Sequence, residues 1–137
     1  MDLADIPLFS MLRSRLGYLS ERQKLIAENV ANSNTAGYAP KDLKPFSFQA
    51  QVEAASTVTP AVTEPGHMLP ARARPGVGGN FKSVKTRDSE TTLDGNSVVL
   101  EEQMMKMSDA RMNYDAAVGF YQKSLDLLRL ATRKPGG

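Results

Sequence analysis

The sequence predicts a mainly α-helical protein, in which two long terminal helices form an antiparallel, coiled-coil-like hairpin with an irregular or short β-hairpin segment between them. Near both ends, apolar residues recur at alternating intervals of three and four, as in helices that pair along a narrow stripe. Between the ends the chain is rich in proline and glycine. These features divide the 137 residues into an N-terminal helical part (1–37), a connecting segment (38–94) and a C-terminal helical part (95–137), within one structural domain.

The first helix is expected to begin between Asp5 and Pro7 and to end near Val30 or Ala31. Aspartate can cap free N–H groups, and proline is tolerated in the first turn of a helix. We call its apolar stripe the N-terminal seam, which comprises Phe9, Leu12, Leu16, Leu19, Ile26 and Val30, with Gln23 as a polar interruption. The asparagine-rich run up to Gly37 is a helix stop signal, because its residues favour turns and left-handed backbone conformations.

The connecting segment contains six of the eight prolines, four of them spaced by five residues. This spacing excludes a long helix, because each proline removes a backbone donor and clashes with the preceding turn. Short extended stretches are expected at 43–52, 57–62 and 81–86, and a loose hairpin could form from them. Residues 60–80 are expected to form a mobile or partner-ordered loop.

The second helix is expected from about Ser97 to Thr132, with Asn96 or Ser97 as its cap. We call its main apolar stripe the C-terminal seam, which comprises Leu100, Met104, Met107, Tyr114, Val118, Tyr121, Leu125 and Leu128, with Arg111 as a polar interruption. A second apolar line comprises Met105, Met112, Ala116, Phe120 and Leu127, extended by Val99 and Ala117. Together they form a wider apolar face than one partner helix needs, so part of it is expected to meet neighbouring subunits.

Composition and charge limit the classes of function. The 17 basic and 15 acidic residues are scattered, so no basic patch for nucleic acid is predicted. Cysteine is absent, which excludes disulfides and thiolate sites. The only histidine, His67, has no companion ligands for a metal, and the glycine-rich run at 76–79 lacks the Lys-Ser or Lys-Thr pair of a phosphate loop. No catalytic residue, cofactor or metal is therefore predicted.

The sequence pattern predicts neither a cleaved signal peptide nor a membrane span. The N-terminus has no basic region followed by an apolar run, so no cleaved signal peptide is predicted. No apolar stretch approaches the roughly 20 residues that span a membrane. The chain is expected to stay in the cytoplasm or to leave by a route without a cleaved signal.

Two stretches are more specific than the helical periodicity. Residues 22–38 join an asparagine-rich helix end to a Thr-x-Gly-Tyr turn, and residues 93–104 join an Asp-Gly-Asn-Ser turn to a helix start. The first closely resembles the N-terminal signature of flagellar rod and hook proteins. The second is similar to the start of the C-terminal helix in proteins of the proximal rod. The motif residues are Asn29, Asn32, Asn34, Thr35, Gly37, Tyr38, Asp94, Gly95 and Asn96.

The first motif also has a physical reading. Asn29 and Asn32 lie about one helical turn apart and can bond exposed carbonyls or a neighbour's backbone. Gly37 permits a tight turn, and Tyr38 can pack its ring back on the helix.

The resemblance implies a structural, non-enzymatic subunit of the flagellar proximal rod, which transmits torque and joins the membrane ring and export gate to the distal rod. It implies type III export without a cleaved signal peptide, and assembly in the periplasm. The implied partners are other copies of this chain, other rod proteins, and export-gate and membrane-ring proteins. The two seams by themselves leave an alternative open: a cytoplasmic helical adaptor or export chaperone that binds one partner helix.

Overall fold

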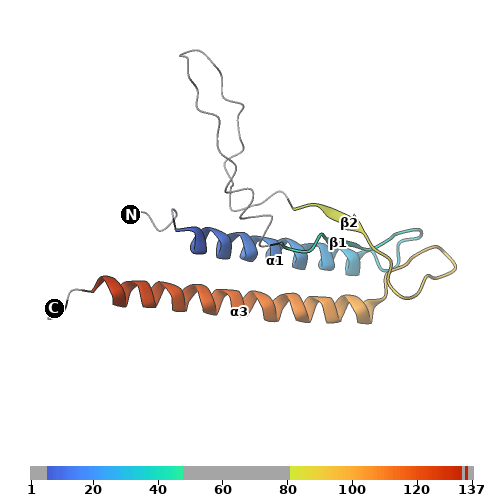
Figure 1. The fold of residues 1–137 in the computed structure, drawn as a ribbon. Helices are drawn as coiled ribbons and strands as arrows, with labels where there is room; N and C mark the ends of the chain where they lie inside the picture. The colour runs from blue at the N-terminus through green and yellow to red at the C-terminus, as the bar shows by residue number, and fades with distance from the viewer. Residues whose placement is uncertain (1–5, 48–80, 134, 136–137) are drawn as a thin grey trace, which may run out of the picture.

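The computed structural model describes residues 6–47, 81–133 and 135. In chain order these form the helix α1 (Pro7–Ala31), the strands β1 (Lys41–Leu43) and β2 (Ser83–Lys85), and the helix α3 (Leu100–Thr132). The two helices run antiparallel, and the strands lie on the side of α1 that faces away from α3 (Figure 1). The expected helical hairpin with a short strand pair is confirmed.

The bounds of α1 agree with the sequence pattern. Pro7 opens the helix, where its missing N–H costs nothing, and Ile6 occupies the N-cap position without a side-chain bond. Asp5, the expected cap, lies outside the described residues. The helix ends at Ala31 as expected, and a turn follows in which Gly37 adopts a positive φ of 71°.

The start of α3 differs from the prediction. Neither Asn96 nor Ser97 caps the helix, which begins at Leu100 after an extended Val99. The Asn96 amide nitrogen instead donates to the carbonyl oxygens of Asn32 and Thr35, at 2.9 and 2.7 Å. Asn96 is thus used to bind the turn after α1, so the cap prediction was wrong for a tertiary reason. The helix ends at Thr132 as expected.

The strands form a two-stranded antiparallel sheet in which Asp42 lies opposite Val84. The expected extended stretch 81–86 contains β2, whereas β1 begins before the stretch expected at 43–52 and shares only Leu43 with it. The stretch 57–62 and the loop expected at 60–80, with His67 and the glycine-rich run, lie outside the described residues. Arg22 of α1 holds β1 through two hydrogen bonds to the Asp42 carboxylate, at 3.1 and 3.2 Å.

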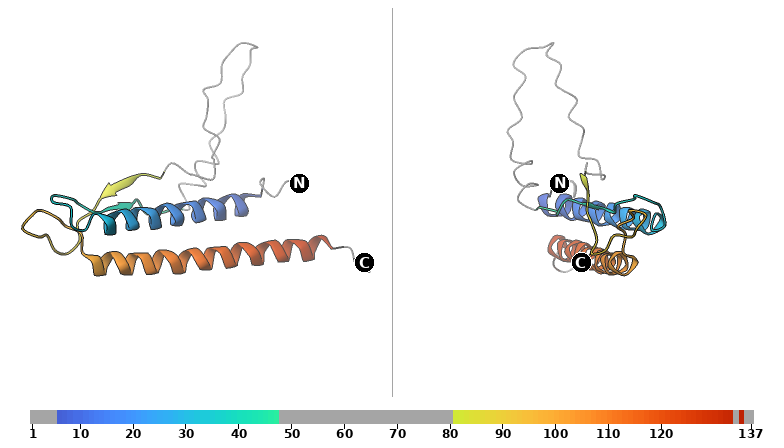
Figure 2. Two further views of the ribbon diagram at one scale, coloured as in Figure 1. Left: turned by 180° about the vertical axis from the view of Figure 1, so that it is seen from behind. Right: turned by 90° about the vertical axis from the view of Figure 1, so that its right-hand side faces the viewer.

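The core surrounds α1 on two sides. Its buried cluster comprises Tyr18, Leu19, Leu25, Leu43 and Ala117, with Leu16, Phe46, Phe81 and Tyr114 packed against it. The Tyr18 ring contacts the rings of Phe46 and Phe81, each at 5.4 Å between centroids. As a result, the 25-residue α1 buries seven residues, whereas the 33-residue α3 buries three. Among the described residues, no other helix or strand covers one long side of α3 (Figure 2).

Candidate assembly interface

The N-terminal seam lies largely inside the subunit. Phe9, Leu12, Leu19 and Ile26 are buried, while Leu16 and Val30 are half-buried. At the open end of the hairpin, the Phe9 ring meets the Tyr121 ring edge-on, with 5.4 Å between centroids and an angle of 87°. Most of this seam is thus covered by α3 and the strands before any neighbour binds.

The C-terminal seam is only partly covered. Met107, Tyr114, Val118, Tyr121, Leu125 and Leu128 are half-buried, whereas Leu100, Met104 and the interrupting Arg111 are exposed. The fully buried positions of α3 are Gln103, Ala110 and Ala117, spaced by seven residues. The small alanines let the two helices approach closely. Sequence reasoning passed over Gln103 and Ala110 because it followed large apolar side chains, although the interval of seven was visible.

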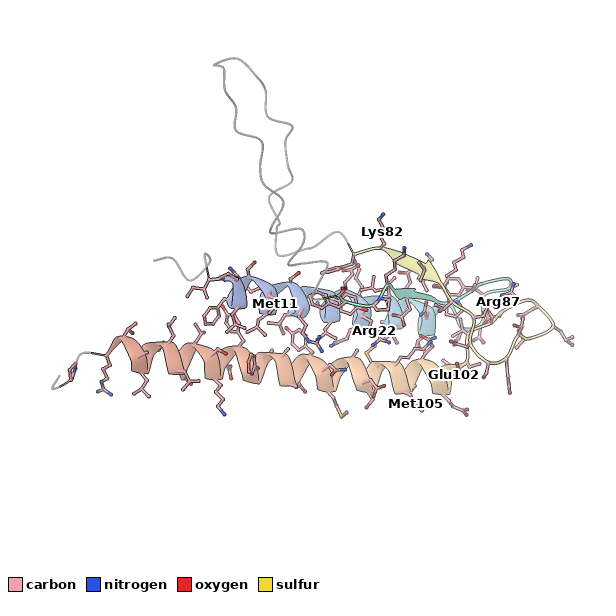
Figure 3. The ribbon with its side chains drawn as sticks, viewed as in Figure 1. Met11, Arg22, Lys82, Arg87, Glu102 and Met105 are labelled. Atoms are coloured by element: carbon pink, nitrogen blue, oxygen red, sulfur yellow. The ribbon has the colours of Figure 1, made fainter. Side chains whose placement is uncertain are left out.

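The second apolar line of α3 faces solvent, except for its expected extension, because Ala117 is buried in the core and Val99 is half-buried. Met105, Met112, Phe120 and Leu127 are 53–65% exposed, and Ala116 is exposed beside them. Their spacing of four and seven residues places them on one side of the helix. Met105 lies on the side of α3 away from α1 (Figure 3). An exposed apolar line of this length is typical of a surface that binds another protein.

The first family motif forms a buried polar cluster at the closed end of the hairpin. Asn29 is 1% exposed and makes four hydrogen bonds. Its amide nitrogen donates to the Lys41 carbonyl at 2.8 Å and to Gln103 Oε1 at 2.9 Å. Its oxygen accepts from the Lys41 N–H at 2.9 Å and from the Tyr38 hydroxyl at 3.2 Å. Asn29 thereby joins α1, β1 and α3 at one point, and its bond to the Lys41 carbonyl is of the kind expected from the motif.

Asp88 extends this cluster beyond α3, and nothing in the sequence pattern marked it. Its side chain is fully buried, and one oxygen accepts from Gln103 Nε2 at 2.9 Å and from the Val99 N–H at 2.8 Å. The other oxygen accepts from Lys106 Nζ at 3.1 Å. Burial acts to raise the Asp88 pKa, but the bonds from Gln103, Val99 and Lys106 outweigh it and hold the pKa below its ordinary value.

The two family motifs meet at the tip of the hairpin. The Gly37 N–H donates to the Asp94 carbonyl at 3.0 Å, and the Ser97 N–H donates to the Tyr38 carbonyl at 3.0 Å. Gly95 has a φ of 83°, and its α-carbon region packs against Gly37. The remaining motif residues complete the turn: Thr35 donates to the Asn32 side chain, and Asn34 lines an open surface cavity. Two sequence stretches about 60 residues apart thus form one structural unit.

The described part of the chain lacks the features of a metal-binding site and of a membrane span. Residues 6–47 and 81–133 contain no group of three or more side chains that could hold a metal. Within the same residues, neither α1 nor α3 combines the length and apolar character that crossing a bilayer requires.

Comparison with known proteins agrees with this picture. A family model described as flagella basal body rod protein matches residues 11–38, which include most of α1 and the first motif. The flagellar basal body rod protein FlgB of Agrobacterium fabrum is 32% identical to this chain over 136 residues, which cover 94% of each protein. The similarity therefore includes both helices and the segment between them. This chain belongs to the FlgB family of flagellar basal body rod proteins.

Proposed function

We propose that this chain is a subunit of the proximal rod, where it transmits torque and joins the membrane ring and export gate to the distal rod. The observation that carries this proposal is the uncovered apolar line along α3. If a neighbouring subunit buried these side chains, each large residue would stabilise the contact by about 1.5–3 kcal/mol. This surface therefore suits a subunit whose neighbours cover α3 in an assembly.

The mechanism is mechanical. Terminal helices pack in an inner layer, with the seams and the second line of α3 as contact surfaces, and the connecting segment reaches to neighbouring subunits. Contacts between different surfaces of successive subunits that do not close into a ring generate a helical tube. Interlocked subunits of this kind resist relative rotation, so a torque applied at one end reaches the other.

The proposed assembly residues follow from both seams. On α1 they are Phe9, Leu12, Leu16, Leu19, Ile26 and Val30, which act mainly by holding α3 in place. On α3 they are Leu100, Met104, Met107, Tyr114, Val118, Tyr121, Leu125 and Leu128, of which Leu100 and Met104 are already exposed for a neighbour.

The proposed route is export through the flagellar type III apparatus without a cleaved signal peptide, followed by assembly in the periplasm. The proposed partners are other copies of the chain, other rod proteins, and proteins of the export gate and membrane ring. The absence of cysteine suits a chain that crosses an export channel unfolded.

Fractionation of cells tests this proposal. The chain should co-purify with detergent-extracted basal bodies, and an electron-microscopy map of those particles should place α1 and α3 between the membrane ring and the distal rod. A chain that stays in the cytoplasmic fraction, bound to one soluble partner, would contradict the proposal and support an adaptor or chaperone.

A further inference from the structure

We propose that Asp88 and Gln103 are positioning residues, which fix the direction of hydrogen bonding at the closed end and thereby set the axial register of α3 on α1. This inference rests on the proposed function, because the register decides which side chains of α3 reach a neighbouring subunit.

The direction of the bonds follows from the donors and acceptors present. A carboxylate can only accept, so Gln103 must turn its nitrogen toward Asp88. The Gln103 oxygen then faces Asn29, so the Asn29 amide nitrogen must donate to it. The Asn29 oxygen is left to accept from Tyr38 and Lys41. Each amide has one satisfied orientation: Asp88 sets that of Gln103, and the Lys41 N–H and carbonyl set the matching orientation of Asn29.

The ion pair at the far end anchors this chain of bonds. Lys106 lies one turn after Gln103 on α3 and reaches the second oxygen of Asp88. The Val99 N–H at the start of α3 binds the same carboxylate. Asp88 therefore contacts α3 at three points within two turns, so the loop before α3 and the helix itself form one rigid piece.

The seam contacts also oppose a change of register. A shift of α3 by one turn, about 5.4 Å, would put Tyr121 or Asn113 in the place of the buried Ala117. The cluster adds a polar requirement at Asn29, where the same shift would put Val99 or Met107 in the place of Gln103. One amide hydrogen would then be buried without an acceptor, which costs more than a rearranged apolar contact. A single polar position fixes the register of coiled coils in the same way.

The Phe9–Tyr121 ring contact reports the register at the open end. Phe9 precedes Asn29 by 20 residues on α1, and Tyr121 follows Gln103 by 18 residues on α3. These intervals correspond to roughly 30 and 27 Å of helix, so both contacts belong to one register. A nuclear Overhauser effect between the two rings is therefore a direct signal for it.

Gln103→Leu provides the first test, in the full chain at dilute concentration. The substitution keeps an apolar contact but removes the link between Asn29 and Asp88. We expect the Phe9–Tyr121 signal to weaken and contacts from Phe9 to Ala117 or Leu125, one turn away on α3, to appear. The matched control is Gln122→Leu, an exposed glutamine on the same helix, which should leave the ring contact unchanged.

Gln103→Glu provides the second test, because its effect should depend on pH. At neutral pH the new carboxylate would face Asp88, and neither group could donate. When protonated, the introduced side chain could donate to Asp88 and accept from Asn29, as glutamine does. Folding should therefore raise the pKa of this carboxyl, so the urea midpoint should approach that of the unsubstituted chain near pH 4 and fall as the pH rises to 7. Gln122→Glu should show no such profile.

The outcomes separate this inference from the proposed function. If Gln103→Leu lowers the urea midpoint but keeps the Phe9–Tyr121 signal alone, the cluster only stabilises the fold and the inference is wrong. An unsubstituted chain without that ring signal would overturn it as well. Neither result depends on basal bodies, so the rod proposal would still stand or fall by fractionation. A flat pH profile for Gln103→Glu would also contradict the role given to Asp88.

Discussion

At the scale of single residues, two glycines hold the tip of the hairpin. Gly37 and Gly95 adopt φ values of 71° and 83°, where residues with a Cβ are strained. A Cβ on Gly95 would also approach the Gly37 α-carbon to 3.4 Å. Gly119, in contrast, lies in the interior of α3 with open space around it. Identical substitutions at these positions should therefore have opposite effects.

Gly95→Ala should lower the free energy of unfolding by about 1–2 kcal/mol, because alanine is strained in the left-handed region. Gly119→Ala should raise it by up to about 1 kcal/mol, because alanine is the better helix former. Urea unfolding followed by circular dichroism measures both. Equal shifts in the same direction would show that the tip does not require the conformation described.

Asp88 should make the fold sensitive to acid. Its pKa is held below the ordinary 3.8, so its contribution to stability is full above that value and is lost as the pH falls through the lower pKa of the folded state. Asp88→Asn can still accept from Gln103 and Val99 but loses the Lys106 ion pair. Urea midpoints measured from pH 6 to pH 2 should therefore fall less steeply in this variant than in the unsubstituted chain. Asp115→Asn, at an exposed position on α3, is the control.

At the scale of elements, the sequence predicts what depends on local pattern. Both helix ends of α1 and the last residue of α3 follow from proline, glycine and periodicity. The start of α3 does not, because Asn96 has the composition of a cap but bonds the turn after α1 instead. The buried line of α3 was also missed, since Gln103 is polar and Ala110 is small, whereas the seams follow large apolar residues. The interval of seven residues was visible, but the bonds that bury Gln103, to Asn29 and Asp88, leave no signal in local periodicity.

Substitutions at Phe120 and at Ala117 test the exposed and the buried face of α3 separately. Phe120→Asp places a charge on the uncovered side. The free energy of unfolding of the isolated chain, measured with urea, should therefore change by no more than about 0.5 kcal/mol. The same variant should fail to enter basal bodies and should abolish swimming. Ala117→Asp buries a charge against α1 and should cost several kcal/mol. Normal swimming of a Phe120→Asp strain would show that this face is not an assembly surface.

At the scale of the whole molecule, the hairpin is held unevenly. The closed end combines the sheet, the tip turns and the cluster around Asn29, whereas the open end has the Phe9–Tyr121 contact. Since Phe9 lies opposite Tyr121, the last turns of α3 continue past the first turn of α1 (Figure 1). Leu127 and Leu130 in these turns are 58% and 66% exposed. The open end therefore gains the most from a neighbour.

This difference predicts a gradient of hydrogen exchange in the unassembled chain. Amides of α1 and α3 near Asn29 and Gln103 should be the most protected, and those at 124–132 should exchange fastest, because local opening there breaks few buried contacts. In purified basal bodies the protection of 124–132 should rise toward that of the closed end, since a neighbouring subunit covers the helix. Exchange followed by mass spectrometry resolves both segments in the same sample. Uniform, strong protection along α3 in a dilute monomer would mean that the open end is complete without neighbours.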